Sequence, residues 1–161
     1  MRSNKLTKLA LLLALALIFS YIESLILFPL GIPGMKLGLA NLMTVLVLYA
    51  YDAKTAFGLN AMRIVIAGFL FGNLFGITYS FAGAIVSFLM MVFCKKVCKL
   101  PIVVTSIAGG VFHNVGQVLF ACMLLESFVM FYYLPALMIS GVITGFLIGM
   151  LGKILFRRGL L

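Results

Sequence analysis

The strongest constraint in the sequence is its division into six apolar stretches by short clusters of charged residues, Pro and Gly. These stretches cover residues 7–28, 37–51, 55–71, 77–93, 102–124 and 134–156. Hydrophobic residues make up 65% of the 161-residue chain and charged residues 9%, whereas a soluble domain has about 45–50% apolar and about 25% charged residues. One bilayer crossing takes about 20 helical residues. We therefore expect an all-α integral membrane protein in which residues 1–161 form a single domain of six transmembrane helices.

The first two stretches each admit another interpretation. The basic start of the chain, followed by Leu and Ala, resembles a signal peptide, but no persuasive small-x-small cleavage site follows it, so we expect a retained first helix. The second stretch would give only about 22 Å of helix at 1.5 Å per residue, against a hydrocarbon core of about 30 Å. To complete a crossing, this helix needs the residues at its two ends to span the remaining distance, or a locally thinner protein.

The basic residues lie mostly on one side of the expected membrane. If each stretch crosses once, ten of the twelve cations fall on one side, Lys36 falls on the other, and Arg63 lies inside the third crossing. The positive-inside rule then places both termini in the cytoplasm. The net charge of +9 therefore indicates orientation in a cell membrane and does not indicate binding to nucleic acid.

The small number of acidic residues argues against catalysis. The carboxylates are Glu23, Asp52 and Glu126, and no two are close enough in sequence to form an acid/base pair or a magnesium site. Residues 149–153 lack the spacing and the trailing Ser or Thr of a phosphate-binding loop. Cys94 and Cys98 have helical spacing but no His or acid beside them. We expect no enzymatic activity, no nucleotide site, no cofactor and no metal.

Several polar side chains occur where the bilayer would normally exclude them, between the midplane and the outer face. They are Glu23, Lys36, Asn41, Arg63, Ser80, His113, Asn114 and Gln117. Such a group costs a few kcal/mol or more in hydrocarbon, so it normally faces a cavity or a partner helix. His113 and Gln117 share one helix face at i, i+4 spacing. We expect the set to line an outward-facing cavity for a small polar or anionic solute; the alternative is that it only bridges packed helices.

Two series of small residues predict close helix contacts. Ala10 and Ala14 form an AxxxA pattern in the first stretch, and Gly141, Gly145 and Gly149 form a GxxxG series in the sixth. Small residues four apart leave a flat strip on which another helix can pack. We expect Ala10, Ala14, Gly141 and Gly145 to dock a partner protein, although helix packing within the chain is the more common use of GxxxG.

The sequence resembles the Gx transporter family, whose members are often labelled heptaprenyl diphosphate synthase component I and are grouped with the S components of energy-coupling factor transporters. The resemblance extends over nearly the whole chain. It rests on Lys-Leu-Gly-Leu-Ala-Asn at 36–41, Arg63, Phe-His-Asn-Val-Gly-Gln at 112–117, Tyr-Tyr-Leu-Pro at 132–135 and Ser-Gly-x-x-Thr-Gly at 140–145.

The resemblance implies an S-component fold and a transport role. It implies as partners an energy-coupling transmembrane protein, which docks at the AxxxA pattern of Ala10 and Ala14, and two ABC-type ATPase subunits. Arg63, with Lys36 and His113, would favour an anionic or strongly hydrogen-bonding ligand. Asn41, Asn114 and Gln117 would set the ligand's orientation.

The synthase label implies a different role. A prenyl synthase needs clustered Asp residues to hold magnesium against diphosphate, and Asp52 is the only Asp in the chain. The second hypothesis is therefore a membrane accessory subunit of heptaprenyl or polyprenyl diphosphate synthesis, which offers the lipid tail a groove while a soluble partner performs catalysis. The identity of the solute stays open.

Overall fold

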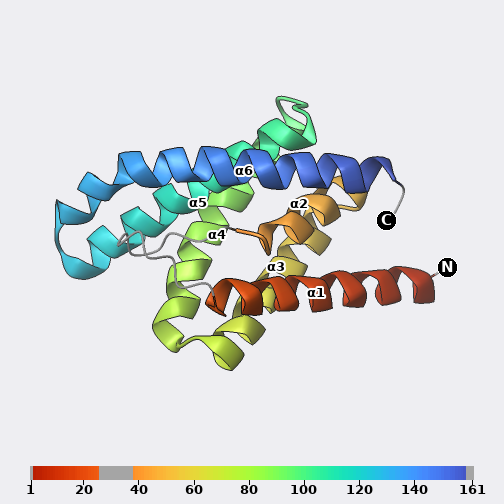
Figure 1. Ribbon diagram of the computed structural model, residues 1–161, viewed down its shortest axis with the longest axis horizontal. Coiled ribbons are helices and arrows are strands. Elements are labelled where there is room, and N and C mark those ends of the chain that lie inside the picture. The colour runs from red at the N-terminus through yellow and green to blue at the C-terminus, as the bar shows by residue number, and fades with distance from the viewer. Residues whose placement is uncertain (1, 26–37, 159–161) are drawn as a thin grey trace.

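The computed structural model of the protein describes residues 2–25 and 38–158, and within these ranges it contains helices and no strand (Figure 1). The helices are α1 (Arg2–Leu25), α2 (Asn41–Ala50), α3 (Ala53–Phe71), α4 (Leu74–Lys96), α5 (Ile102–Leu125), the 3₁₀ helix η1 (Phe128–Tyr133) and α6 (Leu134–Arg157). The predicted all-α class is confirmed, and the helices agree with the predicted stretches to within a few residues.

Five segments among the described residues are long and apolar enough to cross a membrane. They are Lys5–Leu25, Ala53–Phe71, Leu74–Lys96, Ile102–Leu125 and Phe128–Arg157. By contrast, α2 has 10 residues, or about 15 Å of helix, which is half of the hydrocarbon core. The six predicted helices are present, but α2 is too short to be a full crossing by itself.

The short helix α2 forms the centre of the hydrophobic core. Every residue from Leu42 to Leu48 is buried, and these side chains pack with α1, α3, α4, α5 and α6 in one apolar cluster. Figure 1 shows α2 between α1 and α6. A helix that is covered on all sides needs no polar face, which explains why its sequence is almost uniformly apolar.

Glycines allow α5 and α6 to pack backbone against backbone. A Cβ atom added at Gly141 would lie 2.9 Å from the carbonyl of Gly110, and one at Gly145 would lie 2.7 Å from the Cα of Ile107. Gly141 and Gly145 are both buried in this contact. The prediction that these two glycines dock a partner protein is therefore wrong, because they pack α6 against α5 of the same chain.

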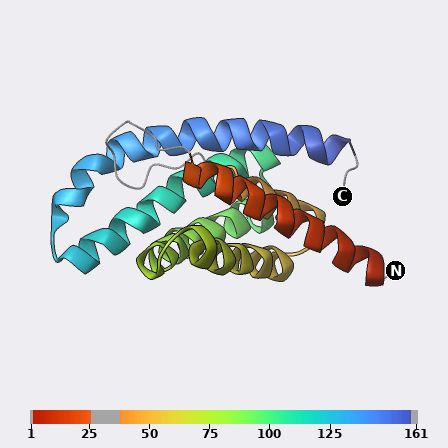
Figure 2. The ribbon, with the colours of Figure 1, turned by 60° about the horizontal axis from the view of Figure 1, so that its bottom comes forward.

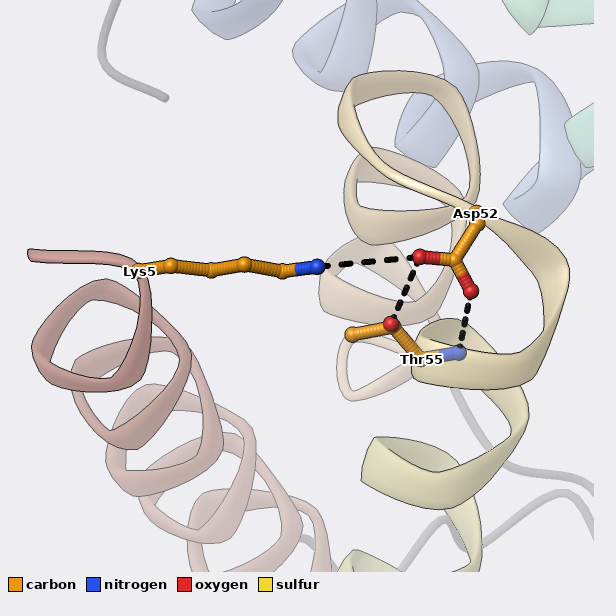
Figure 3. A network of polar contacts seen from close by, with 3 residues as sticks. All are labelled: Lys5, Asp52 and Thr55. Atoms are coloured by element: carbon orange, nitrogen blue, oxygen red, sulfur yellow. Dashed lines mark hydrogen bonds and ion pairs between the residues drawn. The ribbon is translucent and has the colours of Figure 1, made fainter. Parts of the chain in front are cut away.

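Most Lys and Arg residues gather at one end of the molecule, which we call the basic end. Lys5, near the start of α1, forms an ion pair of 3.8 Å with Asp52, and Asp52 caps the first turn of α3 by accepting hydrogen bonds from Thr55 (Figure 3). Lys95, near the end of α4, donates to the carbonyl of Leu48 in α2. The start of α1 and the end of α6 also lie at one end (Figures 1 and 2).

Candidate functional site

Two adjoining cavities lie among polar side chains away from the basic end. The larger, of about 130 Å³, is lined by Ser20, Glu23, Ser24, Arg63, Ile64, Ala67, Gly68, Phe71, Gly72, Gly76 and Ser80. The smaller, of about 50 Å³, is lined by Glu23, Gly38, Ala40, Asn41, Arg63, Ser80, Gly110, His113, Asn114 and Thr144. Glu23, Arg63 and Ser80 line both. These three residues therefore form a common wall between α1, α3 and α4.

Arg63 supplies the positive charge of this wall. It lies near the middle of α3, and its Nη2 donates a hydrogen bond of 2.7 Å to the Oδ1 of Asn60 one turn earlier. The Nε of Arg63 is buried and has no hydrogen-bond partner among the described residues. Glu23 lines the same two cavities as Arg63. Arg63 thus has donor capacity that another molecule could use.

Glu23 links α1 to the segment that leads into α2. Its Oε1 accepts a hydrogen bond of 2.6 Å from the backbone N–H of Leu39. Ser20 and Ser24 flank it on the same face of α1, and each donates its hydroxyl proton to a carbonyl of its own helix. Their oxygen lone pairs remain able to accept hydrogen bonds, so this face of α1 presents acceptors to the larger cavity.

His113 and Asn114, two candidate site residues of the fifth stretch, line the smaller cavity. Asn114 also donates from Nδ2 to the carbonyl of Leu137, at 2.6 Å. This bond ties α5 to α6, so Asn114 contributes to helix packing as well as to the cavity wall. Both roles proposed from the sequence, cavity lining and polar bridging, occur at this residue.

Gln117 occupies a different environment from the other predicted site residues. It is 2% exposed and lies outside the linings of both cavities. Its side chain packs with that of His113 against α4 at Gly83, where an added Cβ would lie 2.8 Å from the Cγ of Gln117. Gln117 is therefore part of the α4–α5 contact and does not contribute to the cavity surface.

The remaining predicted residues are distributed as follows. Ser80 lines both cavities and Asn41 lines the smaller one. Lys36 lies outside the described residues. Ala10 and Ala14 are exposed on the outer face of α1, so this strip is accessible to another helix. Its role in docking a coupling protein stays a prediction.

Sequence reasoning missed Asn60, Ser20 and Ser24. Residues three or four positions apart share a helix face, and Ser24 lies four residues after Ser20. Asn60 is at i−3 from Arg63, and Ser20 is at i−3 from Glu23. The spacing was thus a usable signal, because a buried charge in a membrane helix needs polar neighbours.

The arrangement suits non-covalent binding of a small solute. Pockets for drug-sized ligands measure about 300–1,000 Å³, so cavities of about 130 Å³ and 50 Å³ fit a smaller molecule. The guanidinium can donate to a carboxylate or a phosphate, and the serine and amide groups can hold hydroxyl or carbonyl groups. Among the described residues, no three His, Cys, Asp or Glu side chains come together in a way that could hold a metal ion.

The fold and the cavities define a class: a multi-pass helical membrane protein with polar cavities among its helices. Large apolar side chains on its outer surface are strongly exposed, among them Phe69 at 74% and Met123 at 71%, as a lipid-facing surface requires. The chain belongs to the family described as heptaprenyl diphosphate synthase component I, whose model matches residues 12–155. No curated protein matches the chain, and no solved structure does.

Proposed function

We propose that the protein is a substrate-binding S component, or a close relative, of an energy-coupling factor transporter. The observation that carries this proposal is the common wall of Glu23, Arg63 and Ser80, which faces two adjoining cavities. Ionisable residues within membrane helices mark substrate pathways when they face a cavity. The cavities lie away from the basic end, so the positive-inside rule directs them toward the outside of the cell.

The ligand is a small polar or anionic molecule. Arg63 is the cation of the common wall, and its planar guanidinium can form paired hydrogen bonds with a carboxylate or phosphate. Glu23 lowers the net charge of the wall, and the hydroxyl oxygens of Ser20 and Ser24 can accept hydrogen bonds from hydroxyl or amide groups of the same solute. His113 and Asn114 contact the ligand from α5 in the smaller cavity.

Transport requires partner subunits that supply energy. The AxxxA strip of Ala10 and Ala14 is exposed on α1 and provides a flat surface for a helix of the coupling transmembrane protein. Two ABC-type ATPase subunits complete the assembly. Co-purification of these three proteins after mild extraction from the native host supports this part of the proposal, and their absence contradicts it.

A second candidate function follows from the family description. The family is described as a component of heptaprenyl diphosphate synthase, so the protein could be a membrane accessory subunit that holds the prenyl chain for a soluble catalytic partner. The two functions are distinguished by a deletion strain. Loss of polyprenyl diphosphate synthesis with normal solute uptake favours the accessory role.

The solute-binding proposal is tested by native mass spectrometry of the purified full chain. The wild-type protein is incubated with the small-molecule fraction of the native host's cell extract, and retained compounds are identified. We expect a solute that Arg63→Gln loses and the charge-matched surface control Lys96→Gln retains. Thermal unfolding checks that Arg63→Gln is folded. If the folded variant retains the same compounds as the wild type, the site assignment fails.

A further inference from the structure

A separate groove of about 450 Å³ lies at the basic end, between α2, the start of α5 and the last turns of α6. Its lining residues are Tyr49, Pro101, Ile102, Val103, Met150, Lys153, Phe156 and Arg157. None of these residues lines the polar cavities. The groove is therefore separate from the polar cavities.

The walls of the groove are apolar. Pro101, Ile102 and Val103 form one side, and Met150 and Phe156 form the other, with exposed fractions of 40% and 45% for the latter two. The hydroxyl of Tyr49 already donates to the carbonyl of Leu100 at 2.7 Å. These surfaces suit a hydrocarbon chain, because they present few polar groups that would lose hydrogen bonds to water.

Two cations stand at the edge of this apolar groove. Lys153 and Arg157 are one turn apart on α6, and both are exposed. Neither side chain makes an ion pair or a hydrogen bond with a described residue. The ion pair seen among the described residues joins Lys5 to Asp52, outside the groove. The charges of Lys153 and Arg157 are therefore available to an external anion.

We propose that this groove binds an anionic phospholipid of the surrounding bilayer. One acyl chain lies along Ile102, Val103 and Phe156, and the phosphate lies between Lys153 and Arg157. Basic pockets between transmembrane helices on the cytoplasmic side recognise anionic head groups in this way, and the basic end is the expected cytoplasmic end. This inference does not depend on the proposed transport function.

The test uses the purified full chain and native mass spectrometry, with phosphatidylglycerol and phosphatidylcholine as probes. We expect the wild type to retain phosphatidylglycerol in preference to phosphatidylcholine. A basic residue near the surface contributes about 1 kcal/mol to binding an anionic lipid, so the double variant Lys153→Gln with Arg157→Gln should bind phosphatidylglycerol about 30-fold more weakly. The control carries Lys54→Gln and Lys96→Gln, which remove the same charge from exposed positions outside the groove, and should bind normally.

Three outcomes would overturn the proposal. Equal retention by the wild type and the groove variant would show that Lys153 and Arg157 do not hold the lipid. An equal loss in the control would show that only the overall positive charge matters. In the third outcome, equimolar farnesyl diphosphate displaces phosphatidylglycerol from the wild type, and the groove variant does not bind farnesyl diphosphate. This result would assign the groove to a prenyl diphosphate.

Discussion

Arg63 and Asn60 form a hydrogen-bonded pair one turn apart on α3, with 2.7 Å between Nη2 of the guanidinium and Oδ1 of the amide. Asn60 is 3% exposed, so its acceptor oxygen is shielded from water. The bond holds the guanidinium of Arg63 at the wall that both polar cavities share. Asn60 is thus a positioning residue for the charge that the proposed function requires.

Replacing Asn60 by Ala should weaken both the fold and the site. A hydrogen bond to a charged group contributes about 1.5–3 kcal/mol, so we expect the free energy of unfolding of Asn60→Ala to fall by about that amount. The Arg63-dependent solute should also be retained more weakly. Met62→Ala, on the exposed side of the same helix, is the control. Normal solute retention by folded Asn60→Ala would show that the amide does not position Arg63.

Six of the polar residues that line the two cavities could be predicted from the sequence, because membrane helices contain few polar residues. Glu23, Asn41, Arg63, Ser80, His113 and Asn114 all line a cavity. Gln117 shares a helix face with His113, but only His113 lines a cavity. The sequence could not show that Gln117, one turn further along α5, packs against Gly83 of α4 instead. Spacing along one helix gives a face, whereas the neighbouring helix decides whether that face meets a cavity or a packed contact.

The bond between Glu23 and Leu39 predicts different effects for two substitutions. Glu23→Ala leaves the Leu39 N–H without its acceptor at 2.6 Å, which should cost about 1–3 kcal/mol of unfolding free energy. Glu23→Gln keeps a side-chain oxygen and removes the charge, so it should destabilise the protein much less. Denaturation in detergent micelles measures both. Equal destabilisation by the two variants would show that the charge, and not this hydrogen bond, stabilises α1 against α2.

Replacement by Ala should have opposite effects at two glycines, Gly141 in α6 and Gly58 in α3. Gly141→Ala would place a Cβ 2.9 Å from the backbone of Gly110, and overpacking of this kind costs about 1–3 kcal/mol. Gly58, inside α3, has nothing within 4 Å of an added Cβ, so Gly58→Ala should stabilise the protein by about 0.5–1 kcal/mol through its higher helix propensity. Thermal unfolding of the two variants checks both signs. A stable Gly141→Ala variant would contradict the close α5–α6 contact.

The helix boundaries show what apolar patterning can and cannot predict. The fourth apolar stretch predicts a helix that begins at residue 77, whereas α4 begins at Leu74. Asn73 caps it by accepting a hydrogen bond of 2.7 Å from the N–H of Gly76, so Gly76 lies within the first turn. The length of α2 was overestimated because a buried, apolar segment has the same composition whether or not it spans the membrane.

Asp52 predicts a loss of stability in acid. Its hydrogen bonds with Thr55 hold the pKa of this carboxyl below its ordinary value of 3.8. A carboxyl whose pKa is lower in the folded state stabilises the fold above the unfolded-state pKa, and this contribution is lost as the pH falls through the folded-state pKa. Asp52→Asn keeps a capping oxygen and removes the titration. The unfolding temperature of Asp52→Asn should therefore depend less on pH than that of the wild type below pH 3.8. An unchanged pH dependence would show that Asp52 does not cause the loss of stability in acid.

The proposed function requires the polar cavity to open on the side of the membrane opposite the basic end. Thiol labelling in intact cells tests it most directly. Ser80→Cys is introduced into a chain whose native Cys94, Cys98 and Cys122 are replaced by Ala, and cells are treated with a membrane-impermeant anionic thiosulfonate. The wild-type chain serves as the reference, because its Cys98 is exposed near the basic end whereas Cys94 and Cys122 are buried.

We expect the cysteine at position 80 to be labelled from outside in intact cells, and Cys98 to be labelled only after the membrane is permeabilised. This result would place the wall of Glu23, Arg63 and Ser80 in contact with the external solution. Labelling of position 80 only after permeabilisation, together with labelling of Cys98 in intact cells, would contradict the account by reversing the side from which the solute enters.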